Sequence, residues 1–497
     1  MKYHLVVLIV LVLLVAGAIG FAVRAKQQAQ ATKSISEVTL FDAPSTIAPS
    51  KTARLFVNGQ ECFVYSVFVN PGRENKGNYD VSSVTRAPMA YFDLVRGSAQ
   101  IDIELTSESG FSTLSSAAIS PLSQGIEARI EGRHIRFSVS EPGQYVIQIN
   151  GTAREAFHMF VNEPEENLPD RNNPNVVWIE PGEWSIPDGI QLKSGQTLYI
   201  SSGAVVHTSI SAQFGSNIQI RGRGIIDGGI WESWRGQDAH LPINFQYCSD
   251  VTVEGVILNN SNAWCFNAFE TEHALVDNVK IISARPNGDG FTLQSCRDFT
   301  VQNSFARTWD DSLVVKNYGR DTDGIVFRNM VLWTDLAQSM EIGYETNKGE
   351  QQNSKIQNVL FQNITVVNAF HKPVMSIHNA DDALVEHIVW ENVVVENADL
   401  GNGDAKDNKQ LIDLVIAGSG WSTTKTRGRI HDVVFRNISV LSGGETQEIR
   451  IAGYDEAHGI DGVLIENLSI YGNPIASMAD VQNEVRYARN VEVRWTK

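Results

Sequence analysis

Short apolar runs broken by single polar residues fill the second half of the chain, and their arrangement repeats. The stretches 327–331, 361–366 and 435–440 each hold an asparagine between two apolar runs. Alternation over so few residues predicts β-strands, and a repeat near two dozen residues predicts a solenoid. The equivalent positions, spaced by 23 to 45 residues, are Gly255, Asn278, Asn303, Asn329, Asn363, Asn392, Asn437 and Asn467.

The recurring asparagine has a physical role in such a solenoid. Its amide can bond to the equivalent amides of the coils above and below, while its backbone tolerates the left-handed conformation. We therefore expect an internal amide ladder. Asn363, Asn437 and Asn467 also fit the N-glycosylation pattern, but a buried ladder excludes glycans, which favours the structural interpretation.

Residues 36–165 show a different pattern, in which alternating strands are separated by Gly, Pro and Asn turns. This pattern predicts an antiparallel β-sandwich. A polar, Pro-containing stretch at 163–174 separates it from the repeats, so we place the solenoid at 175–497. The predicted fold is all-β: a right-handed parallel β-helix preceded by a β-sandwich. The sandwich is either a carbohydrate-binding module or, as we prefer, a cap over the first coil.

Composition and the first residues bear on location. The chain of 497 residues is 42% hydrophobic and carries a formal net charge of -17, which argues against a general affinity for nucleic acid. Residues 5–23 form an uninterrupted apolar run that precedes Arg24 and Lys26. Residues 1–31 are therefore an export signal that is cleaved or a membrane anchor that is retained. Either way we expect the rest of the chain to be periplasmic, secreted or attached to the outer side of a membrane.

The chain has four cysteines, and two of them occupy matching repeat positions. Cys248 and Cys296 are expected two coils apart, about 9.6 Å at about 4.8 Å per strand layer, which exceeds the reach of a disulfide. We predict buried free thiols.

Two acidic clusters stand one coil apart. Asp289 lies within Asn-Gly-Asp-Gly at 287–290, and Asp310 and Asp311 follow after 21 and 22 residues. Stacked coils would bring these carboxyl groups close together, so that repulsion keeps one of them protonated. Glycoside hydrolysis needs one carboxylic acid for the leaving oxygen and a carboxylate that activates water or attacks the sugar.

Motifs around these clusters follow a known order. Gly-Arg-Gly-Ile-Ile-Asp-Gly-Gly-Ile-Trp at 222–231 comes first, then Asn-Ser-Asn-Ala-Trp-Cys-Phe at 260–266, then the two acidic clusters. In these motifs the chain resembles the polygalacturonase-like glycoside hydrolases of family 28, and more loosely the β-helical dextranases of family 49. The resemblance implies that Asp310 is the general acid, that Asp289 and Asp311 hold and activate water, and that the anomeric centre is inverted.

Two departures from the family pattern concern the substrate. Gln338 stands where the family has the histidine of Gly-His-Gly, and Ser-Ile-His at 376–378 stands where it has Arg-Ile-Lys, which grips a substrate carboxylate. Serine and histidine cannot reproduce a bidentate guanidinium contact. A neutral glucan or a modified or branched glycan fits better than ordinary polygalacturonate, although Lys316, Lys372 and His371 remain able to contact an acid.

The residues that we expect to contact substrate lie around the aspartates: Asn287, Trp309, Lys316, Gln338, Glu341, Glu345 and His378. Core packing competes with a sugar platform for Trp309, and ordinary surface positions compete with subsite roles for the polar residues. The pair Asp381-Asp382 is interpreted as a solvated loop end. The long intervals before Asn363 and Asn437 predict loops at the cleft wall.

Two other functions compete with hydrolysis. A calcium-dependent β-helix polysaccharide lyase would use the aspartates as metal ligands and Arg285, Arg307 or Lys316 as base. A non-catalytic glycan-binding solenoid would carry an incidental acidic cluster. Hydrolysis is favoured because the paired motifs agree in order and spacing; it requires a polysaccharide partner and neither a metal nor a cofactor.

Overall fold

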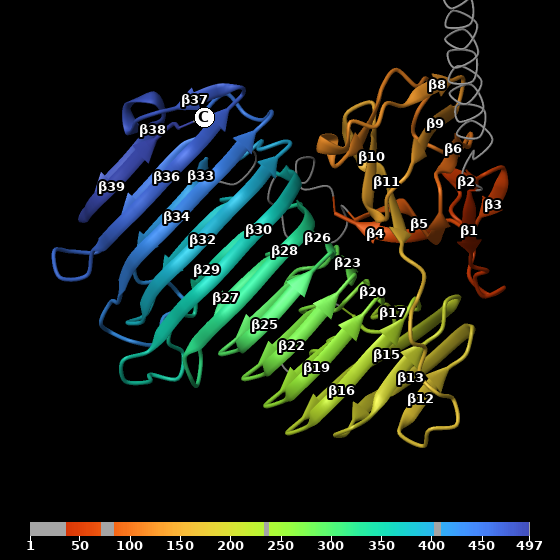
Figure 1. The fold of residues 1–497 in the computed structure, drawn as a ribbon, viewed down its shortest axis with the longest axis horizontal. Coiled ribbons are helices and arrows are strands. Elements are labelled where there is room, and N and C mark those ends of the chain that lie inside the picture. The colour runs from red at the N-terminus through yellow and green to blue at the C-terminus, as the bar shows by residue number, and fades with distance from the viewer. Residues whose placement is uncertain (1–35, 71–83, 233–237, 402–408, 497) are drawn as a thin grey trace, which may run out of the picture.

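The computed structural model describes residues 36–70, 84–232, 238–401 and 409–496, and these residues form β-strands almost throughout (Figure 1). The proposed export signal or anchor falls outside the described residues. Across the ranges given, no helix is both long and apolar enough to cross a bilayer.

The N-terminal strands form two sheets that face each other. Leu55, Ile103 and Phe137 of one sheet pack with Phe92 and Phe157 of the other, as expected of a sandwich. One pair departs from the antiparallel prediction, because β5 and β11 run parallel. The six-stranded sheet comprises β1 (Glu37–Leu40), β4 (Tyr65–Val69), β5 (Thr85–Arg96), β7 (Ala117–Ser120), β10 (Gly143–Ile149) and β11 (Thr152–Asn162). The five-stranded sheet comprises β2 (Ala53–Val57), β3 (Gln60–Cys62), β6 (Ala99–Leu105), β8 (Arg129–Glu131) and β9 (His134–Val139).

The remaining strands wind into a right-handed parallel β-helix, which confirms the predicted fold. Each coil contributes a strand to three faces, called here first, second and third in chain order. The first face holds β12 (Val176–Ile179), β14 (Thr197–Ile200), β16 (Ser216–Gly222), β19 (Ser249–Glu254), β22 (Glu272–Asp277), β25 (Arg297–Gln302), β28 (Thr322–Thr334), β30 (Lys355–Ala369), β32 (Leu384–Val395), β34 (Arg429–Val440), β36 (Ile460–Ile470) and β39 (Ala488–Arg494).

The second and third faces follow in the same coils. The second face holds β17 (Ile225–Asp227), β20 (Ile257–Asn259), β23 (Lys280–Ile282) and β26 (Phe305–Thr308), and continues into the ends of the long strands from β28 onward. Strands β13 (Gly182–Leu192) and β15 (Ala204–Gln213) run across both faces, and β37 (Asn473–Ile475) pairs antiparallel with β36. The third face holds β18 (Ile243–Gln246), β21 (Phe266–Phe269), β24 (Phe291–Gln294), β27 (Leu313–Lys316), β29 (Met340–Tyr344), β31 (Met375–Asn379), β33 (Gln410–Ile416), β35 (Glu448–Ala452) and β38 (Gln482–Arg486).

Identical positions of successive coils stack inside the solenoid. The rings of Phe327, Phe361, Trp390 and Phe435 form one such stack, with centroids 5.2, 5.1 and 4.8 Å apart. One continuous apolar core runs from Ile179 to Ile475. The repeated alternation in the sequence therefore corresponds to columns of side chains, in which equivalent positions of successive coils stack on one another.

The asparagine ladder exists, but it is not internal. Asn329 Nδ2 donates to Asn303 Oδ1 at 2.9 Å, and the chain of amides continues through Asn363, Asn392 and Asn437. All five have positive φ, since the ladder follows the bend between the first and second faces. Most of these side chains are exposed at that bend. The prediction of a buried ladder was wrong because a left-handed corner residue directs its side chain away from the core.

The sandwich does not cap the first coil. Figure 1 shows it beside the solenoid, along β17 to β26. Tyr65, Met89 and Phe160 of the sandwich pack against Ile257 and Phe305 of the second face in one buried apolar cluster. The second face is apolar on its outer side and needs this cover.

The cysteines and the far end of the solenoid agree with simple physical expectations. All four cysteines are free and buried, as predicted.

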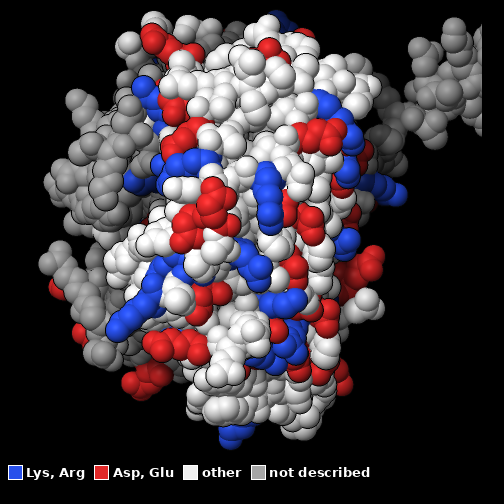
Figure 2. All heavy atoms as spheres, turned by 90° about the vertical axis from the view of Figure 1, so that its left-hand side faces the viewer, with Lys and Arg blue, Asp and Glu red and all other residues white. Residues whose placement is uncertain are grey.

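Figure 2 looks onto the end that carries the last coil, where basic and acidic side chains are interleaved. Arg489 pairs with Asp461 at 3.1 Å and Arg494 with Glu466 at 2.8 Å. Charged side chains on a terminal strand disfavour pairing with another chain.

Candidate active site

The two acidic clusters lie at the entrance of neighbouring strands of the third face. Phe291 of β24 is in register with Leu313 of β27, so Asp289 and Asp311 each stand two residues before equivalent positions. Gly290 N donates to Asp311 O at 2.8 Å and ties the two turns together. The predicted stacking of the aspartates on adjacent coils is present.

The glycines around Asp289 are required by close packing. A Cβ at Gly288 would stand 2.0 Å from Ser283 Oγ, and one at Gly290 would stand 2.3 Å from Ser312 O. Either contact is far inside van der Waals distance. The Asn-Gly-Asp-Gly sequence therefore permits the backbone to bend tightly enough to bring Asp289 to the neighbouring coil.

Backbone N–H groups hold the other two carboxylates. Asp310 accepts from Asn287 N at 3.1 Å and from Asp311 N at 3.2 Å. Asp311 Oδ1 accepts from Gln338 N at 2.9 Å. Three successive coils thus fix the two side chains, and Asp310 receives two hydrogen bonds that favour its ionised form.

The electrostatics couple the three aspartates. Burial raises the pKa of Asp289 well above its usual range, and Asp310 and Asp311 raise it further. Burial also raises the pKa of Asp311 well above its usual range, with Asp310 and Glu341 adding to the rise. Burial raises the pKa of Asp310 as well, although its two backbone donors oppose this. Lys316 lowers the pKa of all three. The cluster therefore keeps a proton at a pH where isolated aspartates are ionised.

Lys316 is fixed by its own ion pair. Its Nζ lies 3.0 Å from Glu345 Oε2, and both side chains are buried. Tyr318 OH donates to Glu345 Oε1 at 3.3 Å, and Lys316 Nζ lies 5.5 Å from the centroid of the Trp264 ring. The ion pair with Glu345 therefore holds the positive charge of Lys316 in a fixed position beside the aspartates.

A chain of alternating charges continues across the next strands of the third face. His378 Nδ1 lies 2.8 Å from Glu341 Oε1, and His378 Nε2 lies 3.1 Å from Asp413 Oδ2. Arg450 Nε donates to Asp413 Oδ1 at 2.7 Å. Burial lowers the pKa of His378, but Glu341 and Asp413 more than offset this and raise it to about 10. The imidazole is therefore a cation between two buried anions. Its ring stacks on Tyr344, with centroids 4.4 Å apart.

A cavity of 260 Å³ opens beside this charge chain. Gln338 Nε2 lies 3.4 Å from Tyr344 OH, and both residues line the cavity together with Lys372. Ser419, from the long loop after β33, also lines the cavity, as expected for a loop at the cleft wall.

Residues 181–488 of the chain match the model of the glycosyl hydrolases family 28. The chain belongs to this family. A probable polygalacturonase of Vitis vinifera is 25% identical over 177 residues, which cover 31% of this chain and 35% of the relative. A probable endopolygalacturonase D of Neosartorya fischeri strain NRRL 181 is 24% identical over 275 residues, covering 46% of this chain and 56% of the relative. The chain thus spans about a third and just over half of these relatives.

The solved structures show the same fold over nearly the whole chain. Dex49A from Penicillium minioluteum superposes with a TM-score of 0.65 at 14% identity, covering 92% of this chain and 96% of that one. Family 28 membership confirms the resemblance drawn from the motifs and supports the glycosidase class, and the structural likeness confirms the fold.

The candidate site gathers most of the residues expected from the sequence. Asn287 contributes its backbone N–H to Asp310, and Lys316, Gln338, Glu345 and His378 lie beside the aspartates or the cavity. Glu341 is fully buried and bonds to His378 and Ser376, so it supports the site from below.

Three expectations were wrong, the first being the substrate contact of Glu341, which its complete burial precludes. Trp309 is fully buried, so core packing occupies the ring that we had considered as a sugar platform. Asp381 is not a solvated loop end: it is fully buried and accepts from the backbone N–H of Thr423 at 2.8 Å and of Thr424 at 2.9 Å. Asp381 therefore holds the long loop against the solenoid, a contact over 42 residues that local sequence does not reveal.

The sequence reasoning also missed residues that complete the site. Tyr318 contacts Glu345 and Asp413 contacts His378, both expected site residues, and Arg450 in turn pairs with Asp413. Asp413 and Arg450 occupy the same register column as Glu341, through Ser376. Correct alignment of the last coils would have found them, but the long loops obscured the repeat there.

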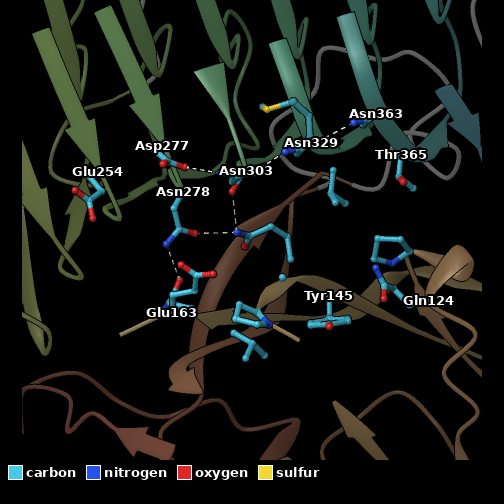
Figure 3. A pocket seen from close by; sticks show the side chains of 18 of the residues that line it. Gln124, Tyr145, Glu163, Glu254, Asp277, Asn278, Asn303, Asn329, Asn363 and Thr365 are labelled. Carbon is cyan, nitrogen blue, oxygen red and sulfur yellow. Dashed lines mark hydrogen bonds between the residues drawn. The ribbon is translucent and has the colours of Figure 1, made fainter. Parts of the chain in front are cut away.

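A second hollow lies away from the aspartates, between the sandwich and the asparagine ladder (Figure 3). Its volume is 510 Å³. Gln144 of the sandwich donates to Asn278 Oδ1 at 3.0 Å and to Asn303 O at 3.1 Å, so the hollow is bridged across its middle. The ring of Tyr145 lines it but is only 2% exposed. The bridging contacts identify this hollow as part of the seam between the two units.

Proposed function

We propose that the protein is a glycosidase that hydrolyses a polysaccharide or oligosaccharide at the cluster of Asp289, Asp310 and Asp311. The single observation that carries the proposal is the trio itself: backbone donors hold Asp310 and Asp311, and the turn of Asp289 is bonded to Asp311 O through Gly290 N. A site that retains one proton among neighbouring carboxylates can donate that proton to a leaving oxygen and still activate water.

Within the trio we assign Asp310 as general acid and Asp289 with Asp311 as the groups that hold and activate water, with inversion. This assignment rests on the family resemblance. The hydrogen bonds and burial within the trio favour another distribution of the proton, because two backbone donors stabilise ionised Asp310 while burial and repulsion favour the proton on Asp289 or Asp311. Substrate binding must therefore move the shared proton to Asp310 for this assignment to hold.

Features outside the trio favour hydrolysis over the lyase alternative. Arg307, one of the bases considered for a lyase, is fully buried and pairs with Asp335 at 2.9 Å. Lys316 is paired with Glu345, and Arg285 Nη1 donates to Trp231 O at 2.6 Å. We further propose export of the protein, as the apolar N-terminal run suggests, and a polysaccharide as its partner.

Reducing-end release from pectic, dextran, pullulan and algal polysaccharides tests the proposal. Native protein should release ends from at least one polymer, and Asp310→Asn should reduce the rate by about 10²–10⁴-fold, the usual contribution of a general acid. Asp250→Asn, at a side chain that is 61% exposed, is the matched control and should leave the rate unchanged. Equal rates for native protein and Asp310→Asn would refute the site. An unsaturated product would identify a lyase instead, and the anomer released first would decide between inversion and retention.

A further inference from the structure

A line of aromatic rings runs along the edge of the third face toward the aspartates. Phe214 stacks on Tyr247, with centroids 4.9 Å apart and planes 7° from parallel. Tyr247 meets Phe269 edge-on at 5.4 Å, and Phe269 meets Tyr318 edge-on at 5.7 Å. The four residues follow or end the third-face strands β15, β18, β21 and β27. The coil of β24, between the last two, contributes no ring to this line.

The outer rings of this line are exposed. Phe214 is 72% and Tyr247 41% accessible to solvent, whereas most large apolar side chains of the solenoid are buried. Two adjacent exposed rings form an apolar surface that is available for binding. Gln213 and Gln246 bond to each other at 3.3 Å immediately before these rings, so amide groups border the apolar faces.

The backbone gives a second, independent reason to see these rings as functional. Phe214 and Tyr247 have φ of 54° and 55°, in the left-handed region that bulky residues rarely adopt. The equivalent turns of the next two coils use Glu270 and Ser295 in the same conformation, so the turn itself does not demand an aromatic residue. Neither the turn nor the core therefore requires the two exposed rings, and their position beside each other on the surface is the feature that needs an explanation.

The line ends at the site already described. Tyr318 OH donates to Glu345, which forms an ion pair with Lys316. Lys316 lowers the pKa of all three aspartates. From the coil of Phe214 to that of Asp310 there are four coil steps, or about 19 Å at about 4.8 Å per step. This length suits several consecutive sugar rings and exceeds what a single sugar requires.

We propose that Phe214, Tyr247, Phe269 and Tyr318 form a stacking track that binds a chain of neutral sugars and directs it to the aspartates. The apolar faces of the sugar rings lie on the aromatic rings, and their hydroxyl groups bond to Gln213 and Gln246. Glu270 beside the track disfavours a polyanionic chain. The inference rests on the proposed glycosidase function for the direction in which the chain leads, but binding can be measured without cleavage.

Affinity electrophoresis of the full chain tests the track. Gels contain dextran, pullulan or polygalacturonate, and every variant also carries Asp310→Asn so that the polymer stays intact. We expect a neutral polymer to retard the protein and the Phe214→Asn/Tyr247→Asn pair to weaken that binding about tenfold. Asparagine suits the left-handed backbone, so the melting temperature should be unchanged or higher. Tyr487→Asn, at a ring that is 45% exposed with φ of 47° on the last coil, is the matched control and should bind like the parent.

The outcomes separate the track from the catalytic proposal. The track would be overturned if the Phe214→Asn/Tyr247→Asn pair bound as tightly as the parent. It would also be overturned if neither neutral polymer retarded the protein, or if polygalacturonate retarded it more strongly. Reducing-end release that persists in that case would leave the glycosidase standing. Retardation that depends on the two rings, without any release by protein with Asp310 intact, would support the track and refute the glycosidase.

Discussion

Two parts of the third face share one backbone arrangement and differ in side-chain chemistry. On the N-terminal side of the aspartates, one outward column runs through Asn244, Asn267 and Thr292. Asn267 Nδ2 donates to Asn244 Oδ1 at 2.9 Å. These groups are neutral, so each contact contributes only the modest net free energy of an ordinary hydrogen bond.

On the C-terminal side the same column carries charges. Glu341, Asp413 and Arg450 occupy it, and His378 inserts between the two carboxylates. Glu341 and Asp413 are fully buried, so every charge depends on its neighbour. The same strand geometry can therefore carry either a row of neutral hydrogen bonds or a rigid wall of buried charges. In the rigid wall, substitution of one charged residue leaves its partner uncompensated.

The largest expected effect comes from removing the central cation of the charged part. His378→Leu leaves Glu341 and Asp413 facing each other without it, which should lower the free energy of unfolding by about 3–5 kcal/mol. Urea denaturation measures this. His387→Asn is the control, because His387 is 55% exposed, lies 3.6 Å from Asp432 and has a φ of 57° that asparagine tolerates. It should change stability by less than about 0.5 kcal/mol. Equal losses in the two variants would contradict the interpretation of a rigid wall.

The same histidine predicts a pH dependence. Its folded pKa of about 10 lies above the unfolded value of 6.5. The stabilisation is therefore complete below pH 6.5 and is lost as pH rises toward 10. The decline in unfolding free energy over this range should be smaller in His378→Gln than in native protein. Identical pH profiles for the two would show that His378 is not charged in the fold.

A gain in stability is expected at the junction of the two parts. The raised pKa of Asp289 means that its ionisation destabilises the fold once pH exceeds the ordinary aspartate value. Asp289→Asn should therefore raise the free energy of unfolding at pH 7, as urea denaturation would measure. The gain should disappear near pH 3. A loss of stability at pH 7 would mean that the carboxylate is better compensated than its surroundings suggest.

The smallest effect belongs to the neutral part. Asn244→Ala, at the half-buried member of the column, removes the hydrogen bond from Asn267 and should lower the free energy of unfolding by about 0.5–1.5 kcal/mol. Thermal unfolding followed by circular dichroism measures the change. A loss comparable to that of His378→Leu would remove the distinction between the two parts.

Much of the fold could be predicted because each coil repeats the same local pattern of apolar, polar and turn residues. The alternation around Asn329, Asn363 and Asn437 encodes a strand, a left-handed corner and another strand, and stacking multiplies this unit. The same regularity allowed the aspartates to be placed on adjacent coils. It failed for Asp413 and Arg450, where long loops shift the numbering between equivalent positions.

The parallel β-helix, its recurring asparagines and the meeting of Asp289 with Asp310 and Asp311 could be read from the chain, because they follow from a short repeat and a fixed distance between coils. The folded structure was needed to show that the sandwich covers the second face, that Asp381 is buried and that Trp309 belongs to the core. It alone also joined Phe214, Tyr247, Phe269 and Tyr318 into one line. These features depend on which surfaces meet over long sequence distances, and burial is a property of that meeting rather than of any local pattern.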